Sequence, residues 1–398
     1  MVWCPLCTDV ESPMERKRIV IIAKAIYPST LARATRASEL AKELARQGHE
    51  VTLYAELGDF DYATYETENS LAVKNIGRLL FSTFNSDGVI KKTTFASPPR
   101  IVLSRLLGKV FGRLLEFPDI ELMFRMRRIV EAERDADLLI SVAMPHPIHW
   151  GCALARSRNR RAFPKIWIAD CGDPYMGNQV TSKLPLFYFK WLEKWFCREA
   201  DCLTVPIEGA IKGYYQEFWG KISVIPQGVR FKTVCTGAGH SKNAIPTFAY
   251  AGSFYKGVRD PSAFLEYLST VNSDFKMILF VSSDYLVASY VKRLGKRIEI
   301  RGFIPREQLL VMLAQMDFLV NFENGTSVQS PSKLIDYAVV NKPVLAIQQD
   351  TLPVETINEF LKGDYRNQYR IENPDQYRIE NVAGKFLSLY DRCLWKYV

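Results

Sequence analysis

The sequence predicts an α/β fold of two Rossmann-like domains, each built on a parallel sheet, that face each other across a central cleft. Apolar strand segments alternate with helices whose apolar residues recur every three or four positions, as in βαβ units. This alternation occurs twice, before and after a stretch rich in Gly and Pro. The length of 398 residues and the apolar content of 48% suffice for a core in each domain.

The first domain is expected over residues 16–230, after a disordered tail at residues 1–15. Residues 18–23 predict a buried strand, residues 31–47 an amphipathic helix and residues 48–54 the exit into a second strand. A less regular stretch follows. Further strands are then predicted at 137–141, 165–169, 201–205 and 221–225, with helices from about 149 and at 186–199.

A linker at residues 231–246 leads to the second domain, which is expected over residues 247–375. Its predicted strands lie at 247–251, 275–281, 297–300, 317–321 and 343–347. Residues 376–398 predict a final helix that crosses back to the first domain. Open α/β sheets bind ligands at the carboxyl ends of their strands, so the cleft between the domains is the expected site.

The clearest chemical signal is the start of the helix expected before strand 343–347. The Ser-Pro pair at 330–331 suits a helix cap and first turn. The backbone N–H groups of Ser332, Lys333 and Leu334 are free at the start of this helix. Together with the Lys333 ammonium, they favour binding of an anion such as a phosphate. Asp336, one turn after Ser332, is placed to reach past the phosphates to a ribose hydroxyl. The alternative is a capped helix that binds nothing.

Composition and charge exclude several classes of protein. The net charge of +9 and the pI near 9.0 favour acidic partners such as nucleotide phosphates or anionic lipids. No apolar run approaches the ~18 residues of a membrane span, and no secretion signal is recognisable, so a cytoplasmic protein is predicted. No nucleic-acid-binding motif accompanies the charge, so nucleic acid is not an expected partner.

The eight cysteines are mostly isolated and predict no disulfide framework. Cys4 and Cys7 have the spacing of half a zinc site, but no second Cys or His pair lies within the usual distance. No metal site is therefore predicted, and neither cysteine is assigned a role.

Several short motifs occur in a fixed order, at 48–51, 225–229, 250–261, 301–305, 331–337 and 342–344. Together they resemble a GT-B glycosyltransferase of the large family-4 type, similar to enzymes of bacterial cell-surface polysaccharide assembly. The resemblance covers most of residues 16–396. It implies transfer of a sugar from a nucleotide diphosphate to a hydroxyl, with retention at the anomeric carbon and no obligatory metal or cofactor. Protein cations and helix-start N–H groups can neutralise the departing diphosphate without Mg²⁺.

The same resemblance assigns the donor contacts. Arg259 matches the family's phosphate-binding basic residue; the alternative is a surface arginine paired with Asp260. The nucleotide base is expected near Gly302 and Phe303, and the ribose on Asp336.

The sequence departs from the family pattern at three places. Phe264 replaces a lysine, for which Lys256 or Lys333 is the expected substitute. Val328 replaces the first of two paired glutamates, and residues 27–30 replace a glycine pair. Contacts to the donor sugar are therefore expected from the loop residues Asn324, Gly325, Thr326 and Ser327.

Two polar segments of the first domain follow strands and are expected to face the cleft. They resemble the Ser-Ser-x-Pro-Pro…His and Asp-x-x-Asp-Pro-Trp segments of a subset of the family. His149 is predicted to hydrogen-bond the donor sugar or the acceptor, and Asp173 to orient the acceptor hydroxyl. The alternatives are helix capping by His149 and turn formation by Asp173 and Pro174.

Residues 100–115 predict an amphipathic basic helix, with Arg105, Lys109 and Arg113 on one face and apolar residues on the other. Such a helix can lie on the inner face of an anionic membrane and bring the protein to a lipid-linked acceptor. The alternative is a helix packed on the first domain with a solvated charged edge.

The sequence therefore predicts a retaining glycosyltransferase that moves a sugar from a nucleotide diphosphate donor to a glycan or lipid-linked acceptor in cell-surface polysaccharide synthesis. Two alternatives stay open, a nucleotide-sugar epimerase on the same scaffold and a catalytically silent nucleotide-sugar-binding protein. Nucleotide release that depends on an acceptor distinguishes the transferase from both.

Overall fold

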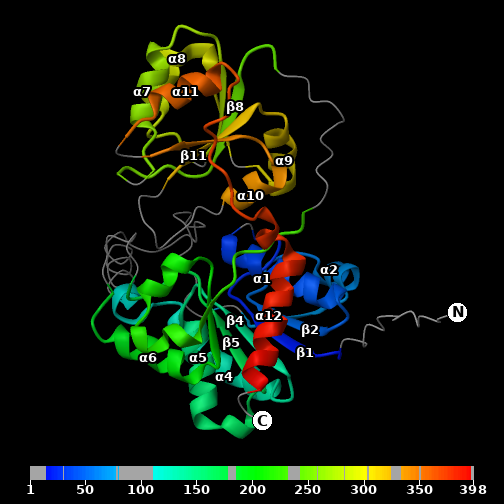
Figure 1. The fold of residues 1–398 in the computed structure, drawn as a ribbon. Helices are drawn as coiled ribbons and strands as arrows, with labels where there is room; N and C mark the ends of the chain where they lie inside the picture. The colour runs from blue at the N-terminus through cyan, green and yellow to red at the C-terminus, as the bar shows by residue number, and fades with distance from the viewer. Residues whose placement is uncertain are drawn as a thin grey trace, which may run out of the picture.

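The computed structural model describes residues 15–29, 31–77, 79, 111–177, 185–231, 243–257, 259–281, 283–302, 304–323, 333–348 and 351–395. These residues form two α/β domains that lie one above the other in Figure 1. Each domain contains a parallel sheet flanked by helices, so the predicted fold class is confirmed.

The first domain contains a parallel sheet in the order β3-β2-β1-β4-β5-β6-β7. Its strands are β1 (Arg18–Ile22), β2 (Glu50–Ala55), β3 (Ala72–Asn75), β4 (Leu138–Val142), β5 (Ile166–Asp170), β6 (Cys202–Val205) and β7 (Ile222–Val224). Its helices are α1 (Ala32–Arg46), α2 (Tyr62–Asn69), α4 (Ile120–Ala132), α5 (Pro147–Arg158) and α6 (Phe189–Glu199), and residues 111–115 are also helical. Every residue of β4 and β5 is buried, as expected for central parallel strands covered on both faces.

The second domain contains a smaller parallel sheet in the order β10-β9-β8-β11-β12. Its strands are β8 (Thr247–Ala251), β9 (Lys276–Phe280), β10 (Ile298–Arg301), β11 (Phe318–Phe322) and β12 (Val344–Ile347). Its helices are α7 (Ser262–Thr270), α8 (Ala288–Leu294), α9 (Arg306–Ala314), α10 (Lys333–Val340) and α11 (Val354–Leu361). In both sheets the strand order reverses beside the first strand, between β1 and β4 and between β8 and β11, and ligands bind beside such switch points.

Each sheet has an apolar core on both faces. In the first domain, α1 packs on one face of the sheet and α4, α5 and α6 cover the other. In the second domain, α7, α8 and α11 pack on one face and α9 and α10 on the other. The carboxyl ends of the strands are therefore the positions from which loops reach the cleft.

The last helix, α12 (Ile379–Leu394), packs on the first domain although it follows the second one in the sequence. Figure 1 shows it in red alongside α1. Val382 and Phe386 are buried in the same core as Ala37 and Leu40 of α1.

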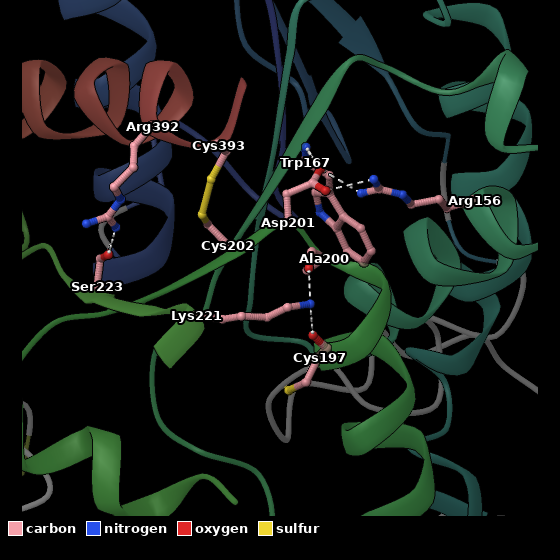
Figure 2. Close-up of a disulfide and its surroundings, with 10 residues drawn as sticks. All are labelled: Arg156, Trp167, Cys197, Ala200, Asp201, Cys202, Lys221, Ser223, Arg392 and Cys393. Atoms are coloured by element: carbon pink, nitrogen blue, oxygen red, sulfur yellow. Dashed lines mark hydrogen bonds and ion pairs between the residues drawn. A yellow bond between two sulfur atoms is a disulfide. The ribbon is translucent and has the colours of Figure 1, made fainter. Parts of the chain in front are cut away.

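A disulfide joins α12 to the first sheet, between Cys393 and Cys202 of β6 (Figure 2). Beside it, Arg392 donates to Ser223 Oγ at 2.7 Å, which connects α12 to β7 as well. The sequence predicted no disulfide framework and gave no indication of this bond. Its 191-residue separation leaves no local spacing signal from which to predict the pair.

Candidate functional site

The cleft between the domains contains a cavity of about 1180 Å³. The first domain lines it with the loop after β1 and one face of α1. The second domain lines it with the loop after β8, residues 304–310 and the start of α10. This volume is sufficient for a nucleotide sugar together with part of an acceptor.

Lys333, at the start of α10, presents a buried cation to this cavity. The residue is only 6% exposed, and its Nζ atom has no hydrogen-bond partner among the described residues. The ammonium lies 4.1 Å from the centroid of the Tyr250 ring, a cation–π contact that offsets part of the cost of burial. Burial, and then the positive charge of Arg259, lower the pKa of Lys333 well below its usual value. An anionic ligand would relieve both effects.

Arg259 lies beside the same tyrosine, at the end of a tight turn. The backbone N–H groups of Tyr255 and Arg259 each donate to the other residue's carbonyl oxygen, and Gly257 between them has φ +76°. The guanidinium lies 4.9 Å from the Tyr255 ring centroid, and its buried Nε has no hydrogen-bond partner among the described residues. Burial raises the pKa of Tyr250 to about 12, although the charge of Arg259 opposes the shift. The structure thus places Arg259 beside Lys333, which lines the cavity, while Arg259 itself lines a small separate pocket with Asp260 and Phe264.

Gly252 lies in the loop after β8, close to Tyr250 and Lys333. Its φ of +145° is in the region that favours glycine, and Lys333 Cδ lies 3.8 Å from the position that a Cβ would take. A side chain at this position would therefore crowd the Tyr250 hydroxyl, which lies 3.2 Å from the position of that Cβ.

Asp336 also lines the cavity, but it is already paired. Arg306, the first residue of α9, donates from Nε to Asp336 Oδ1 at 2.6 Å. Burial raises the pKa of Asp336, and Arg306 opposes that shift. Arg306 was not predicted from the sequence, because an arginine that follows Pro305 at a helix start carries no signal of its own.

The remaining donor-side predictions are less central or lie outside the described residues. Gly302 is exposed at the end of β10, Lys256 is exposed on the turn before Arg259, and Leu334 is buried in the core. The predicted residues that lie outside the described part of the chain are Phe303, Ser332, Asn324, Gly325, Thr326 and Ser327.

On the first domain, a buried ionic cluster supports the loop that carries Asp173. Arg36 donates to both carboxylate oxygens of Asp170, at 2.6 and 2.7 Å, and Arg33 donates to one of them at 2.7 Å. Burial alone would raise the pKa of Asp170, but Arg36 and then Arg33 lower it to about 2. Asp173 is half-buried three residues further on and interacts electrostatically with Arg33.

The cluster also reaches the connection between the domains. Arg36 donates to the carbonyl oxygens of Pro226 and Ile225, at 2.6 and 3.1 Å. The signal for Arg36 was present in the sequence, since it lies four residues before Leu40 on the apolar stripe of its helix. A charged residue on such a stripe requires a buried partner.

His149 does not reach the cavity, contrary to the predicted contact with sugar or acceptor. It is fully buried in the first turns of α5, where its Nδ1 pairs with Ser141 Oγ at 2.8 Å. Its ring packs 5.0 Å from that of Phe196 on α6. The reason is that His149, in the first turn of α5, lies on the helix face that packs against β4 and α6.

The basic helix predicted over residues 100–115 is described only from residue 111. Arg113 is exposed there, whereas Arg105 and Lys109 lie outside the described residues, as do Cys4 and Cys7. In the described part of the chain, no cluster of His, Cys, Asp or Glu could hold a metal ion. No described helix has the length and apolar character needed to cross a bilayer.

The comparisons with known proteins agree with this architecture. A model of Glycosyltransferase Family 4 matches residues 34–232, half of the chain. The chain belongs to Glycosyltransferase Family 4. A search of curated proteins found no match to the sequence of this chain.

Solved structures resemble this family member along nearly its whole length. A glycosyltransferase from Rickettsia africae has a TM-score of 0.60 at 12% identity, over 96% of this chain and 99% of its own. HepE from Anabaena, solved in complex with UDP, has a TM-score of 0.57 at 11% identity, over 94% and 100%. A putative UDP-N-acetylglucosamine 2-epimerase from Listeria monocytogenes has a TM-score of 0.54 at 12% identity, over 94% and 95%. At these identities the similarity shows the fold, which is GT-B.

Proposed function

We propose that this protein is a retaining glycosyltransferase that moves a sugar from a nucleotide diphosphate donor to a hydroxyl of a glycan or lipid-linked acceptor in cell-surface polysaccharide synthesis. The observation that carries the proposal is the buried ammonium of Lys333, which lies beside Arg259, has no hydrogen-bond partner among the described residues and lines a cavity large enough for donor and acceptor. A buried cation without a partner is costly, so a site that retains one is suited to an anionic ligand.

In this mechanism the two cations bind the diphosphate. Negative charge increases on the diphosphate as the bond to the sugar breaks, and Lys333 and Arg259 stabilise that charge inside the cleft. The guanidinium can donate two parallel hydrogen bonds to phosphate oxygens, whereas the ammonium acts as a point charge. This arrangement supplies the charge compensation without a metal ion.

The ribose is assigned to Asp336, which Arg306 holds by the ion pair. The base is assigned to the segment at Gly302 and Phe303, and the donor sugar to residues 324–327. Asp173 is the candidate for orienting the acceptor hydroxyl, because it lies on the first-domain loop after β5, supported by Arg33. His149 is not assigned a contact with either substrate.

The UDP in the HepE structure makes uridine nucleotides the first donors to test. Isothermal titration of UDP and GDP into wild type and an Arg259→Ala variant is the direct experiment. We expect one nucleotide to bind the wild type and to lose about 30-fold or more in affinity in the variant, as for removal of a charge-assisted contact. Equal binding by the two proteins would contradict the site.

An epimerase is the second candidate, because the Listeria relative has the same scaffold. Such an enzyme interconverts sugars without an acceptor. Incubation with UDP-sugars, followed by separation of the sugar products, distinguishes the two reactions. A changed sugar that still carries UDP, formed in the absence of acceptor, would replace the transferase proposal. A protein that binds UDP-sugar without either reaction would be a silent partner.

A further inference from the structure

Helix α6 carries an aromatic and basic face that the proposed donor site does not use. Phe187, just before the helix, is 68% exposed and Trp191 is 57% exposed. The Lys190 ammonium lies 5.2 Å from the Trp191 ring, and Arg198 is exposed two turns further on. The opposite face of α6 is buried through Phe189, Glu193, Phe196 and Cys197, so this helix is amphipathic.

The helical residues 111–115 extend this face. The Tyr188 hydroxyl donates to the carbonyl oxygen of Leu114, which fixes the two segments against each other. Leu114 and Leu115 are 40% and 47% exposed, and Arg113 is exposed beside them. We use the name α6 surface for the set formed by Phe187, Lys190, Trp191, Arg113, Leu114 and Leu115.

This surface has the composition of a membrane-interface element. Trp and Phe rings are favoured at the level of the lipid headgroups, and Lys and Arg beside them attract anionic lipids. The acids closest in the sequence are directed elsewhere, since Glu193 is buried and Glu116 accepts a hydrogen bond from the Tyr175 hydroxyl at 2.6 Å. The net charge of +9 on the chain adds a long-range attraction to an anionic membrane.

The α6 surface borders the loop that carries Asp173. Tyr175 lies two residues after Asp173, and its hydroxyl donates a hydrogen bond to Glu116, which directly follows the helical residues 111–115. The Tyr175 ring centroid lies 5.1 Å from that of Phe189, the first residue of α6. Parallel strands end at the cleft edge and the helices run back from it, so the first turn of α6 lies at that edge. Figure 1 shows α6 on the outer side of the first domain.

We propose that the α6 surface docks in the interfacial plane of an anionic bilayer and presents a lipid-linked acceptor to the Asp173 loop. Docking uses insertion of Phe187 and Trp191 together with the charges of Lys190 and Arg113. Delivery of the acceptor depends on the proposed transferase function, whereas docking itself does not.

The test is co-sedimentation of the full chain with vesicles of phosphatidylcholine alone or mixed with phosphatidylglycerol. We expect binding to the anionic vesicles that weakens with salt. The Lys190→Gln/Arg113→Gln variant should bind about 30-fold more weakly, as expected for the loss of two interfacial cations. The Phe187→Ser/Trp191→Ser variant should lose about tenfold or more, because apolar insertion is removed.

Matched controls lie on the second domain. Tyr285 is 60% exposed, and Lys292 and Lys296 are exposed. Tyr285→Ser and Lys292→Gln/Lys296→Gln should bind vesicles as the wild type does, and all variants should keep the wild-type thermal unfolding transition. If either α6-surface variant unfolds at a lower temperature than the wild type, the vesicle-bound fractions of the two proteins are compared at a temperature below both unfolding transitions.

Three outcomes would overturn docking: no binding of wild type to anionic vesicles, equal loss in the second-domain controls, or full binding by both α6 variants. UDP titration into the same samples distinguishes docking from the transferase function. Wild type that binds UDP but not vesicles overturns docking alone, and wild type that binds vesicles but not UDP overturns the donor site alone.

Discussion

Replacing Lys333 by Met should make the protein more stable and a poorer donor binder. Burial of an isolated ammonium costs several kcal/mol. The Lys333 ammonium lies 4.1 Å from the centroid of the Tyr250 ring, and this contact offsets about 2 kcal/mol of that cost. Methionine has a similar length and packs well against an aromatic ring. The Lys333→Met variant should therefore gain on the order of 2 kcal/mol in its free energy of unfolding at neutral pH.

The pH dependence of this gain follows from the lowered pKa of Lys333. The cost of the buried charge is fully present below the lowered pKa and vanishes above 10.5, the usual lysine value. The stability difference between Lys333→Met and wild type should therefore shrink as the pH rises toward 10.5. Urea unfolding at a series of pH values measures it.

The same variant should lose catalysis. Removal of one positioned cation from the departing diphosphate costs roughly 2 to 4 kcal/mol of transition-state stabilisation, or about 30- to 1,000-fold in kcat/KM. Lys362→Met, at an exposed lysine of the same domain, is the matched control and should change neither property. Wild-type stability combined with wild-type turnover in Lys333→Met would refute the reasoning.

Four further predictions concern other parts of the site. Asp170→Asn should destabilise the first domain by about 3 to 5 kcal/mol in urea unfolding; in wild type the contribution of this carboxylate is present above pH 3.8 and is lost as the pH falls toward 2. Arg306→Gln should raise KM for the donor about tenfold, because Asp336 loses the partner that orients it; an unchanged KM would remove Arg306 from the site. Asp173→Asn should lower acceptor-dependent turnover about 100-fold or more while the Kd for UDP in titration stays at the wild-type value. Transfer should continue in excess chelator; activity that is abolished and then restored by Mg²⁺ would contradict charge compensation by Lys333 and Arg259.

The sequence predicted most strands and most helices because their apolar spacing is regular. The short strand β3 and the helices α2 and α4 were not predicted, since they lie in a stretch of weak periodicity. β3 is half-buried or exposed throughout, so its residues alternate too weakly to indicate a strand.

The site was partly predictable for a different reason. Lys333, Arg259 and Asp336 belong to motifs with a local helix-start or turn signal, and the structure places Lys333 and Asp336 on the cavity wall and Arg259 beside Lys333. Tyr250 and Arg306 interact with them only through tertiary packing, which a single sequence does not encode in spacing. His149 was misplaced because position after a strand does not determine which way a helix start turns its side chains.

The path of the chain through α12 determines the order in which the domains can fold during synthesis. Two segments that connect the domains lie together, as Val229 N–H donates to Tyr377 and Ile379 N–H donates to Val229, at 2.9 and 3.0 Å. Beyond this crossing, α12 supplies Phe386 and Tyr390 to a core whose members outside α12 all lie at or before Ile225, so they emerge from the ribosome before the second domain does. Domains usually fold as units in the order of synthesis. Here the second domain can close its sheet first, while α1 keeps an apolar face uncovered until α12 arrives.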